Sequence, residues 1–308
     1  MDFDVDVVVL VYNQERTVGI ALDSILRQQT SLNFRILLFD DCSSDRSNDI
    51  CLWYAEKYPN VIYTRNSTNL GVVRNYIKAF ASCNAANISI LEGDDYWIDD
   101  YKLESQAAIL RVNPDIGLVF SDYLILRDHD LKLFETSLLL RVYSKATLKH
   151  LFPSLLRRNH ICPATTMFRR KLLDDIDFEF MISRKYLTID YHLWLHISKT
   201  YRAFYHSSPT AVYRVSSNSV SNTSNLSGRM KFATTRINTV LYFTRDAPFD
   251  KSLDCVCEEV KLLDAIRCFN LHSSKQNLTK LINIFQIRPL LMLLFSVLLF
   301  KSSRRVRY

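Results

Sequence analysis

Continuous apolar runs that alternate with stretches of helical spacing constrain the fold of this chain more than any other feature. Strands buried on both faces of a sheet are apolar at nearly every position, whereas half-exposed strands alternate with polar residues. The runs of this kind are VDVVVLVY (5–12), FRILLFD (34–40), NISILEG (87–93) and IGLVFSDYLIL (116–126), with a shorter one at VIYTRN (61–66). Their order predicts an α/β fold with a mostly parallel sheet flanked by helices.

Helices are predicted between these runs from the spacing of the apolar residues and from prolines that stop two of them. The predicted helices of the first half are 15–29, 45–58, 72–83 and 100–113. After about residue 130 the alternation becomes weaker. The elements predicted there are helices at 147–158, 187–201 and 229–286, and short strands at 165–169 and 210–215.

Polar clusters follow three of the predicted strands directly. They are YNQE (12–15), DDCSSD (40–45) and EGDD (92–95). In open parallel sheets, ligands bind beyond the carboxyl ends of the strands. The three clusters therefore predict one shared binding site at this edge of the sheet.

Composition excludes several classes of protein. The chain has 308 residues, a net charge of +7 and only five glycines. Neither GxGxxG nor GxxxxGKS/T occurs, which excludes the glycine-rich phosphate cradles of dinucleotide-binding and P-loop proteins. No helix-turn-helix, RNA-recognition or zinc-finger signature accompanies the positive charge, so nucleic acid is not an expected partner. The seven cysteines include no CxxC pair, which indicates reduced thiols in a cytoplasmic protein.

The EGDD cluster raises a question of charge. Glu92, Asp94 and Asp95 place three carboxylates within four residues, and like charges at this spacing repel one another. Either they lie in a solvated surface turn or a cation holds them. Mg²⁺ and similar hard cations bind through one or two carboxylates together with substrate phosphate.

The order of these motifs resembles the family 2 inverting glycosyltransferases of the GT-A fold. The motifs that carry the resemblance are YNQE, SILRQ, DDCSSD, RNSTNLGVVRN, EGDDYW, IDYHLW and YRVSSNSVS, which lie between about residues 5 and 221. The resemblance implies a Rossmann-like GT-A domain, a nucleotide-sugar donor and a divalent metal, Mn²⁺ or Mg²⁺. It favours the cation over the solvated turn for the EGDD cluster.

Carried over residue by residue, the resemblance implies a donor site. Asp41 corresponds to the carboxylate that hydrogen-bonds the imide of uracil, and Tyr12 to the aromatic residue beside the base. Arg74 corresponds to a basic residue of the donor pocket. Asp94 is expected to accept from the ribose hydroxyls while Asp95 reaches the metal, because adjacent residues of an extended chain face opposite ways. The alternative for Tyr12 is a buried aromatic residue at the end of a strand.

The later motifs imply the catalytic half. IDYHLW resembles the segment that carries the general base, which makes Asp190 the candidate. The glutamate that usually precedes the base is Ile189 here, and Ser216 stands where a histidine often completes the metal shell. Trp194 is expected in the core, with an aromatic plate under a sugar as the alternative. His192 and the histidine four residues later lack an HExxH motif, so packing is expected rather than metal binding.

The predicted domain boundary lies after the last of these motifs. Residues 1–228 are expected to form the GT-A domain, with a nucleotide-binding half at about 1–125 and an acceptor half at about 126–228. Residues 229–308 are expected to form a helical extension with a basic, apolar, membrane-associating tail.

The tail predicts attachment to a membrane surface. The apolar segment 281–300 is interrupted by Arg288 and Pro289, so its uninterrupted part is too short to span a bilayer of about 30 Å. The basic end KSSRRVRY would be drawn to anionic lipid. The expected location is therefore cytoplasmic and peripheral, at the inner face of the plasma membrane, with a helix docked on the protein's own surface as the alternative.

These motifs and the features of the tail together predict an inverting glycosyltransferase of cell-surface polysaccharide synthesis. It would move a sugar from a nucleoside diphosphate sugar, UDP-linked by preference, to a saccharide or lipid-linked acceptor. The alternative is a non-catalytic nucleotide-sugar-binding module on a degenerate scaffold, which Ile189 and Ser216 favour. A nucleotidyltransferase would need a glycine-rich basic loop after the first strand, and YNQERTVG lacks one.

Overall fold

The computed structural model describes residues 3–127, 130–134, 147–148, 151–215 and 226–245. The chain divides into two units, residues 1–216 and 217–308, and each is described by itself. The described part of the second unit is helix α9 (Leu226–Thr244). None of the helices within the described ranges combines the length and the apolar character that crossing a bilayer requires.

The first unit is built on one mixed sheet, with strand order β3-β2-β1-β4-β9-β6-β10-β5 in the part of the chain that is described. The strands on this path are β1 (Val5–Val11), β2 (Phe34–Asp40), β3 (Val61–Arg65), β4 (Asn87–Glu92), β5 (Tyr96–Trp97), β6 (Ile116–Arg127), β9 (Met167–Arg169) and β10 (Arg202–Val215). Two more strands lie off it: β7 (Asp130–Phe134) pairs with β6, and β8 (Thr147–Leu148) with β10.

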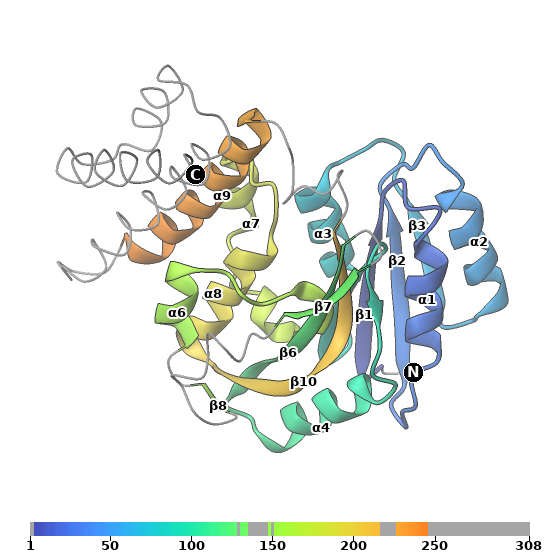
Figure 1. The fold of residues 1–308 in the computed structure, drawn as a ribbon, viewed down its shortest axis with the longest axis horizontal. Helices are drawn as coiled ribbons and strands as arrows, with labels where there is room; N and C mark the ends of the chain where they lie inside the picture. The colour runs from blue at the N-terminus through green and yellow to red at the C-terminus, as the bar shows by residue number, and fades with distance from the viewer. Residues whose placement is uncertain (1–2, 128–129, 135–146, 149–150, 216–225, 246–308) are drawn as a thin grey trace, which may run out of the picture. The chain divides into compact units, whose positions relative to one another are not determined.

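The predicted α/β class is confirmed, and most of the described strands run parallel to one another. β1 to β4 are parallel to one another, and β6 is parallel to β10. The short strand β9 pairs antiparallel with both β4 and β6, so it joins the two parallel groups. Figure 1 shows the resulting twisted sheet with helices around it.

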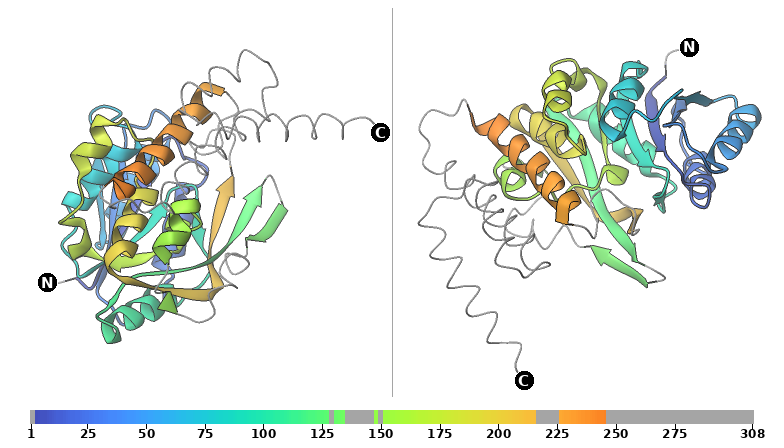
Figure 2. Two further views of the ribbon diagram at one scale, coloured as in Figure 1. Left: turned by 90° about the vertical axis from the view of Figure 1, so that its left-hand side faces the viewer. Right: turned by 90° about the horizontal axis from the view of Figure 1, so that it is seen from above.

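Helices cover both faces of the first strands. Right-handed crossovers place consecutive helices on one face as long as the chain moves in one direction along the sheet, and on the other face when it returns. Accordingly, α1 and α2 lie on one side of β1 to β3, and α3 lies on the other (Figure 2). The helices of this unit are α1 (Val18–Leu26), α2 (Ser47–Lys57), α3 (Val72–Ala81), α4 (Lys102–Val112), α6 (Leu151–Arg157), α7 (Phe178–Ser183) and α8 (Asp190–Thr200).

The strand register brings the three polar clusters to the same edge. Val11 of β1 lies beside Asp40 of β2, and Leu10 lies beside Glu92 of β4. All seven residues of β1 are buried, as the continuous apolar run predicted. The strands therefore end together, and the residues that follow them surround one site.

One strand is longer than predicted, and two short elements were not predicted. β10 begins at Arg202 rather than at residue 210, because its register shifts between His206 and Pro209 and the alternation of side chains is broken there. β5 and α7 were not predicted, since elements of two and six residues leave no periodic pattern.

A lysine lies in the core between the sheet and α4. The Lys102 side chain is fully buried, and its Nζ donates to Ser89 Oγ (3.0 Å), Gln106 Oε1 (2.9 Å) and the Thr166 carbonyl (3.2 Å). The amine also lies 4.3 Å from the centre of the Trp97 ring. Burial lowers the pKa of Lys102 to about 7.

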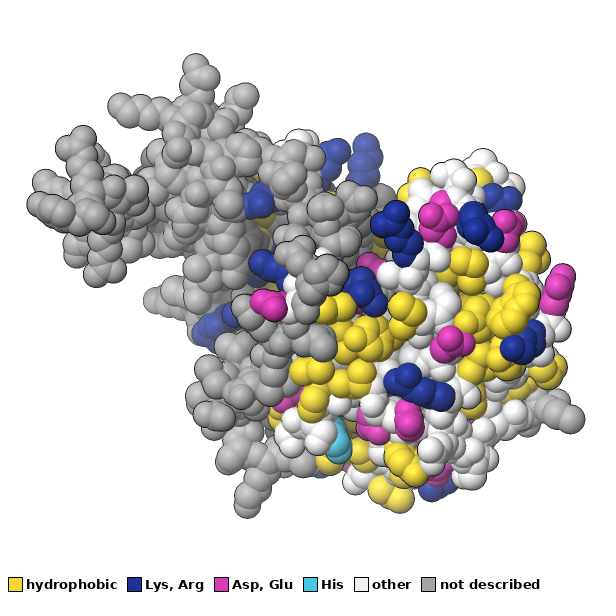
Figure 3. All heavy atoms as spheres, turned by 45° about the vertical axis from the view of Figure 1, so that its right-hand side comes forward, with side chains coloured by type: hydrophobic (Ala, Val, Ile, Leu, Met, Phe, Trp, Pro, Cys, Tyr) yellow, Lys and Arg dark blue, Asp and Glu magenta, His cyan; other side chains and the backbone are white. Residues whose placement is uncertain are grey.

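The surface carries charges of both signs. On the face drawn in Figure 3, Lys and Arg side chains lie among Asp and Glu side chains, with hydrophobic side chains between them. Neither positive nor negative side chains predominate on the described part of this face. Binding to a nucleic-acid backbone, by contrast, requires a stripe of basic side chains.

Candidate active site

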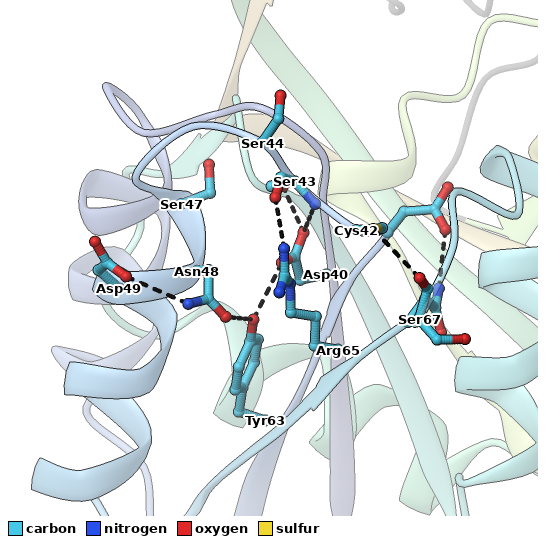
Figure 4. A network of polar contacts seen from close by, with 12 residues as sticks. Asp40, Cys42, Ser43, Ser44, Ser47, Asn48, Asp49, Tyr63, Arg65 and Ser67 are labelled. Carbon is cyan, nitrogen blue, oxygen red and sulfur yellow. Dashed lines mark hydrogen bonds and ion pairs between the residues drawn. The ribbon is translucent and has the colours of Figure 1, made fainter.

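The loop after β2 is held by Asp40, whose side chain points back into the sheet. Its carboxylate accepts from the backbone N–H of Ser43 (3.0 Å), from the Ser43 hydroxyl and from the hydroxyl of Tyr63 (3.1 Å) (Figure 4). The guanidinium of Arg65 on β3 lies 3.3 Å away. Asp40 therefore orients the loop and has no capacity left for a ligand.

Asp41 fastens a second loop to the same edge. Its buried carboxylate accepts from Asn66 Nδ2 (2.9 Å) and the backbone N–H of Leu70 (2.8 Å) at Oδ1, and from the backbone N–H of Gly71 (2.8 Å) at Oδ2. Gly71 has a φ of 80°, a conformation that favours glycine. Each carboxylate oxygen has two acceptor positions, so Oδ1 is saturated and Oδ2 retains one.

Tyr12 and Arg74 both face solvent near this edge. Tyr12 follows β1 and is 50% exposed, so the alternative that placed it in the core is wrong. Arg74 is exposed on the first turn of α3, three residues after the Gly71 that Asp41 holds. Both side chains are thus open to a ligand at the ends of the strands.

Gln14 and Gly93 bring the first and third polar clusters into contact. A Cβ atom at position 93 would lie 2.4 Å from Gln14 Oε1 and 3.2 Å from the Leu10 carbonyl oxygen. The backbone N–H of Gly93 donates to that same carbonyl (2.9 Å). The absence of a Cβ at position 93 therefore lets the EGDD turn pack directly against the end of β1, whereas a larger residue would displace the Gln14 side chain and press on the Leu10 carbonyl.

The carboxylates of EGDD are not a solvated turn. Asp95 is only 1% exposed, and its Oδ1 accepts from the backbone N–H of Arg214 (2.8 Å) on β10. Its other oxygen, Oδ2, is buried and has no hydrogen-bond partner among the described residues. The Arg214 side chain donates from Nε to the Asp94 carbonyl (2.9 Å). β10, which also pairs with β5 directly after the turn, therefore fixes the EGDD turn.

The three carboxylates of the EGDD cluster lie close together in a site that is largely shielded from water. Burial raises the pKa of Asp95, and the neighbouring Asp94 and Glu92 raise it further. Burial also raises the pKa of Glu92, with contributions from Asp94 and Asp190, although a hydrogen bond from the Tyr76 hydroxyl (2.9 Å) opposes the shift. A buried carboxylate oxygen without a donor fits a hard divalent cation.

The rest of a metal shell is not found among the described residues. They contain no group of three or more His, Cys, Asp or Glu side chains placed to hold a metal. Ser216, which was considered for this role, lies outside the described residues. Asp95 is thus the protein ligand that the described geometry offers.

Asp190 lies beside this cluster although it is far away in the sequence. It is the first residue of α8, and its proximity shows in the raised pKa of Glu92 and of Tyr76, to which its charge contributes. Asn159 Nδ2 donates to Asp190 Oδ2 (2.8 Å), and the Thr188 hydroxyl also hydrogen-bonds the carboxylate. Burial raises the pKa of Asp190, which makes it a stronger base than an exposed aspartate.

The aromatic residues of α8 belong to the core. Trp194 is fully buried, and its ring packs edge-on against Phe168 with 5.8 Å between centres. The prediction of a core residue is confirmed, and the alternative of a plate under a sugar is wrong. His192 packs against Tyr186 and Phe180, with ring centres 5.9 and 6.4 Å apart.

Sequence reasoning missed three residues that touch the cluster. They are Tyr76, which bonds Glu92, Asn159, which bonds Asp190, and Arg214, which bonds both Asp94 and Asp95. Arg214 lies inside the motif YRVSSNSVS, so its position was marked but its role was not. Asn159 begins the segment NHICPATTMFRR (159–170), which resembles the family's acceptor-side segment, so its position was also marked without a role. Tyr76 carries no local signal.

The strand order and the helices on both faces of the sheet are those of an α/β fold of the GT-A type. The model of the family described as "Glycosyl transferase family 2" matches residues 6–177, more than half of the 308 residues. The chain therefore belongs to glycosyl transferase family 2.

Curated relatives are similar in sequence to part of this chain. The UDP-Glc:alpha-D-GlcNAc-diphosphoundecaprenol beta-1,3-glucosyltransferase WfgD of Escherichia coli is 28% identical over 200 residues, which cover 64% of this chain and 71% of that protein. Uncharacterized mycobacterial proteins are 32% identical over 115 residues, which cover 37% of this chain. The chain thus spans about a third (33%) of the length of those mycobacterial relatives.

Solved structures share the fold. Staphylococcus aureus TarS 1–349 in complex with UDP superposes with a TM-score of 0.62 at 18% identity, covering 92% of this chain and 79% of that one. The mannosyltransferase PcManGT of Pyrobaculum calidifontis, in complex with GDP-Man and Mn²⁺, gives a TM-score of 0.60 at 14% identity, with the same coverage of 92% and 79%.

Proposed function

We propose that this chain is an inverting glycosyltransferase that transfers a sugar from a nucleoside diphosphate sugar to an acceptor hydroxyl. The observation that carries the proposal is the pairing of two carboxylates at one edge of the sheet. Asp95 has a buried oxygen without a donor, and Asp190 lies beside the same cluster with a raised pKa. The first is suited to a cation and the second to accepting a proton.

The donor base would be read by Asp41. Its Oδ2 has one free acceptor position, which suits the single N–H of the uracil imide. Guanine presents two adjacent donors, which would require both carboxylate oxygens, and Oδ1 is saturated by Asn66 and Leu70. This count favours UDP over GDP, in line with the UDP bound to TarS. Tyr12 would lie along the base, Asp94 at the ribose and Arg74 near the phosphates.

A divalent metal, Mn²⁺ or Mg²⁺, would be held at Oδ2 of Asp95, with donor phosphate and water as the remaining ligands. When bound, it would supply a positive charge that stabilises the departing diphosphate. The Mn²⁺ in the complex of PcManGT supports this proposal. A cation there would also offset the mutual repulsion of Asp95, Asp94 and Glu92.

Asp190 would take the proton from the acceptor hydroxyl. The oxygen of that hydroxyl then forms a bond to the anomeric carbon while the bond from this carbon to the diphosphate breaks on the opposite face, which inverts the configuration. The diphosphate leaves with the bonding electron pair. Burial raises the pKa of Asp190, which favours its protonation in this step.

The acceptor would be a saccharide or a lipid-linked saccharide of cell-surface polysaccharide. The name of WfgD specifies a diphosphoundecaprenol-linked acceptor, which is membrane-bound by its lipid. An enzyme acting on such an acceptor would work at the cytoplasmic face of the membrane. The basic, apolar tail at 281–308, which lies outside the described residues, is proposed to hold it there.

The test is a transfer and donor-hydrolysis assay across UDP-, GDP- and dTDP-sugars with Mn²⁺. We expect turnover with a UDP-sugar, abolition in Asp95→Ala and a smaller loss in Glu92→Gln, since among the described carboxylates of EGDD it is Asp95 that has a fully buried oxygen without a hydrogen-bond partner. Full activity of the unchanged enzyme in EDTA, or of Asp95→Ala in Mn²⁺, would overturn the metal assignment. Tight UDP binding without turnover of any donor would favour the non-catalytic binding module.

A further inference from the structure

The side chain of Asn159 has a fixed orientation toward Asp190. Its Oδ1 accepts from the backbone N–H of Ile161 (3.3 Å), so the donor end of the amide, Nδ2, must face the other way. In that direction it donates to Asp190 Oδ2 at 2.8 Å. The contact is therefore a hydrogen bond to a carboxylate in which the amide cannot reverse its ends without losing both partners.

The segment that carries Asn159 is anchored independently of this bond. His160 is buried, and its Nδ1 lies 3.0 Å from the Arg158 carbonyl oxygen. The hydroxyl of Tyr191, the residue after Asp190, donates to the carbonyl of Leu155 (2.7 Å) at the end of α6. The start of α8 and the chain after α6 thus form one rigid junction, and Asn159 is placed there without needing Asp190 to hold it.

The chemistry of an amide suits this position better than a cation would. A Lys or Arg beside Asp190 would stabilise the carboxylate strongly and weaken it as a base. Asn159 orients the carboxylate while it adds no charge, and so less of the basicity that burial confers is lost. The neighbouring Ile189 is buried and apolar. The carboxylate therefore has the Thr188 hydroxyl as its local side-chain partner, and Asn159 adds a second from a segment thirty-one positions earlier.

We propose that Asn159 is a positioning residue for the general base: its amide holds Asp190 in the one orientation in which the carboxylate meets the acceptor hydroxyl. Asn159 itself does not touch the reacting atoms. The inference rests on the proposed role of Asp190 and goes beyond it by assigning a function to a residue of the acceptor side.

The first test compares Asn159→Ala with Asn113→Ala. Asn113 also makes a 2.8 Å bond through Nδ2, to the Ile109 carbonyl at the end of α4, and lies outside the site. Loss of a hydrogen bond to a charged group is expected to lower kcat about 10- to 100-fold in Asn159→Ala. The Kd for UDP and the KM for the donor should stay unchanged, because Asn159 is not part of the donor site. Asn113→Ala should leave kcat unchanged.

The second test is a double-mutant cycle with Asp190→Asn, followed by a sensitive radiolabel transfer assay. If Asn159 acts through the carboxylate, Asn159→Ala causes little further loss when Asp190 is already Asn. An equal fold-loss in both backgrounds would show a merely structural role and overturn the proposal. Asn159→Ser, which keeps a small donor, is used in the same cycle if the Ala variant does not fold.

The outcomes separate the two levels of inference. Near-wild-type turnover in Asp190→Asn, at an unchanged melting temperature, would remove the proposed base and the mechanism built on it. A loss of the 10²–10⁴-fold expected for a missing general base, together with Asn159→Ala within twofold of wild type, would leave the base in place and reject the positioning role alone.

Discussion

The buried amine of Lys102 predicts an unusual dependence of stability on pH. Its folded-state pKa is about 7, against an ordinary value of 10.5. Between these values the unfolded chain binds a proton that the folded chain does not, so the free energy of unfolding rises as the pH rises. From pH 7.0 to pH 8.5 the expected gain from this one group is about 1–2 kcal/mol.

Urea denaturation at pH 7.0 and pH 8.5 measures this contribution when wild type is compared with Lys102→Met. Methionine fills similar space without a proton to bind, so the Met variant should lack the gain of about 1–2 kcal/mol. The window ends at pH 8.5 because buried thiols act in the opposite sense above it. The pKa of Cys51, for example, is raised to about 12, and such a group destabilises the fold once the unfolded thiol ionises.

Lys57→Met is the matched control. Its amine also lies over a tryptophan, 4.4 Å from the centre of the Trp53 ring, but Lys57 is exposed. Its replacement should change stability by the same amount at both pH values. If wild type and Lys102→Met gain equally between pH 7.0 and 8.5, Lys102 keeps its proton in the folded state and the reasoning is refuted.

Three further predictions follow from other sites. Gly93→Ala should destabilise the fold by about 1–3 kcal/mol in thermal unfolding, because the added Cβ meets Gln14 and the Leu10 carbonyl; unchanged stability would mean that the turn can move aside. Burial lowers the pKa of His160 to about 4, so wild type should lose about 2 kcal/mol between pH 6.5 and 4.5 that His160→Gln does not lose; parallel acid-unfolding curves would contradict this. Deletion of 287–308 should reduce co-sedimentation with anionic liposomes, and undiminished co-sedimentation would reject the membrane anchor.

The donor edge could be predicted from the sequence because it depends on local pattern and on parallel pairing. A continuous apolar run shows in the sequence where its strand ends. Parallel strands that start at one edge of the sheet also end together at the other edge. The pairing of Val11 with Asp40 and of Leu10 with Glu92 is the direct expression of this rule. No knowledge of distant contacts was needed to place Asp41 and Asp95 at one edge.

The acceptor half could not be predicted in the same way, because its contacts join segments far apart in the chain. Asn159 reaches Asp190 across thirty-one positions and Arg214 reaches Asp95 across 119. Neither pair has a spacing that a periodic pattern could reveal. The domain boundary at 228 and the division near residue 125 also stay predictions, since no described feature tests them.

The hydrogen bond from the Arg214 backbone N–H to Asp95 has a consequence for the order in which parts of the protein fold. A main-chain donor is removed only by substitution to proline, so other side-chain changes at position 214 leave this support in place. Its two ends are nevertheless separated by most of the unit, and contacts of such high sequence separation form late in folding because the loop between them must first be closed. A nascent chain can therefore build β1 to β4 and the Asp41 loop early. Asp95 becomes fixed only when β10, the last described strand in chain order, has been added.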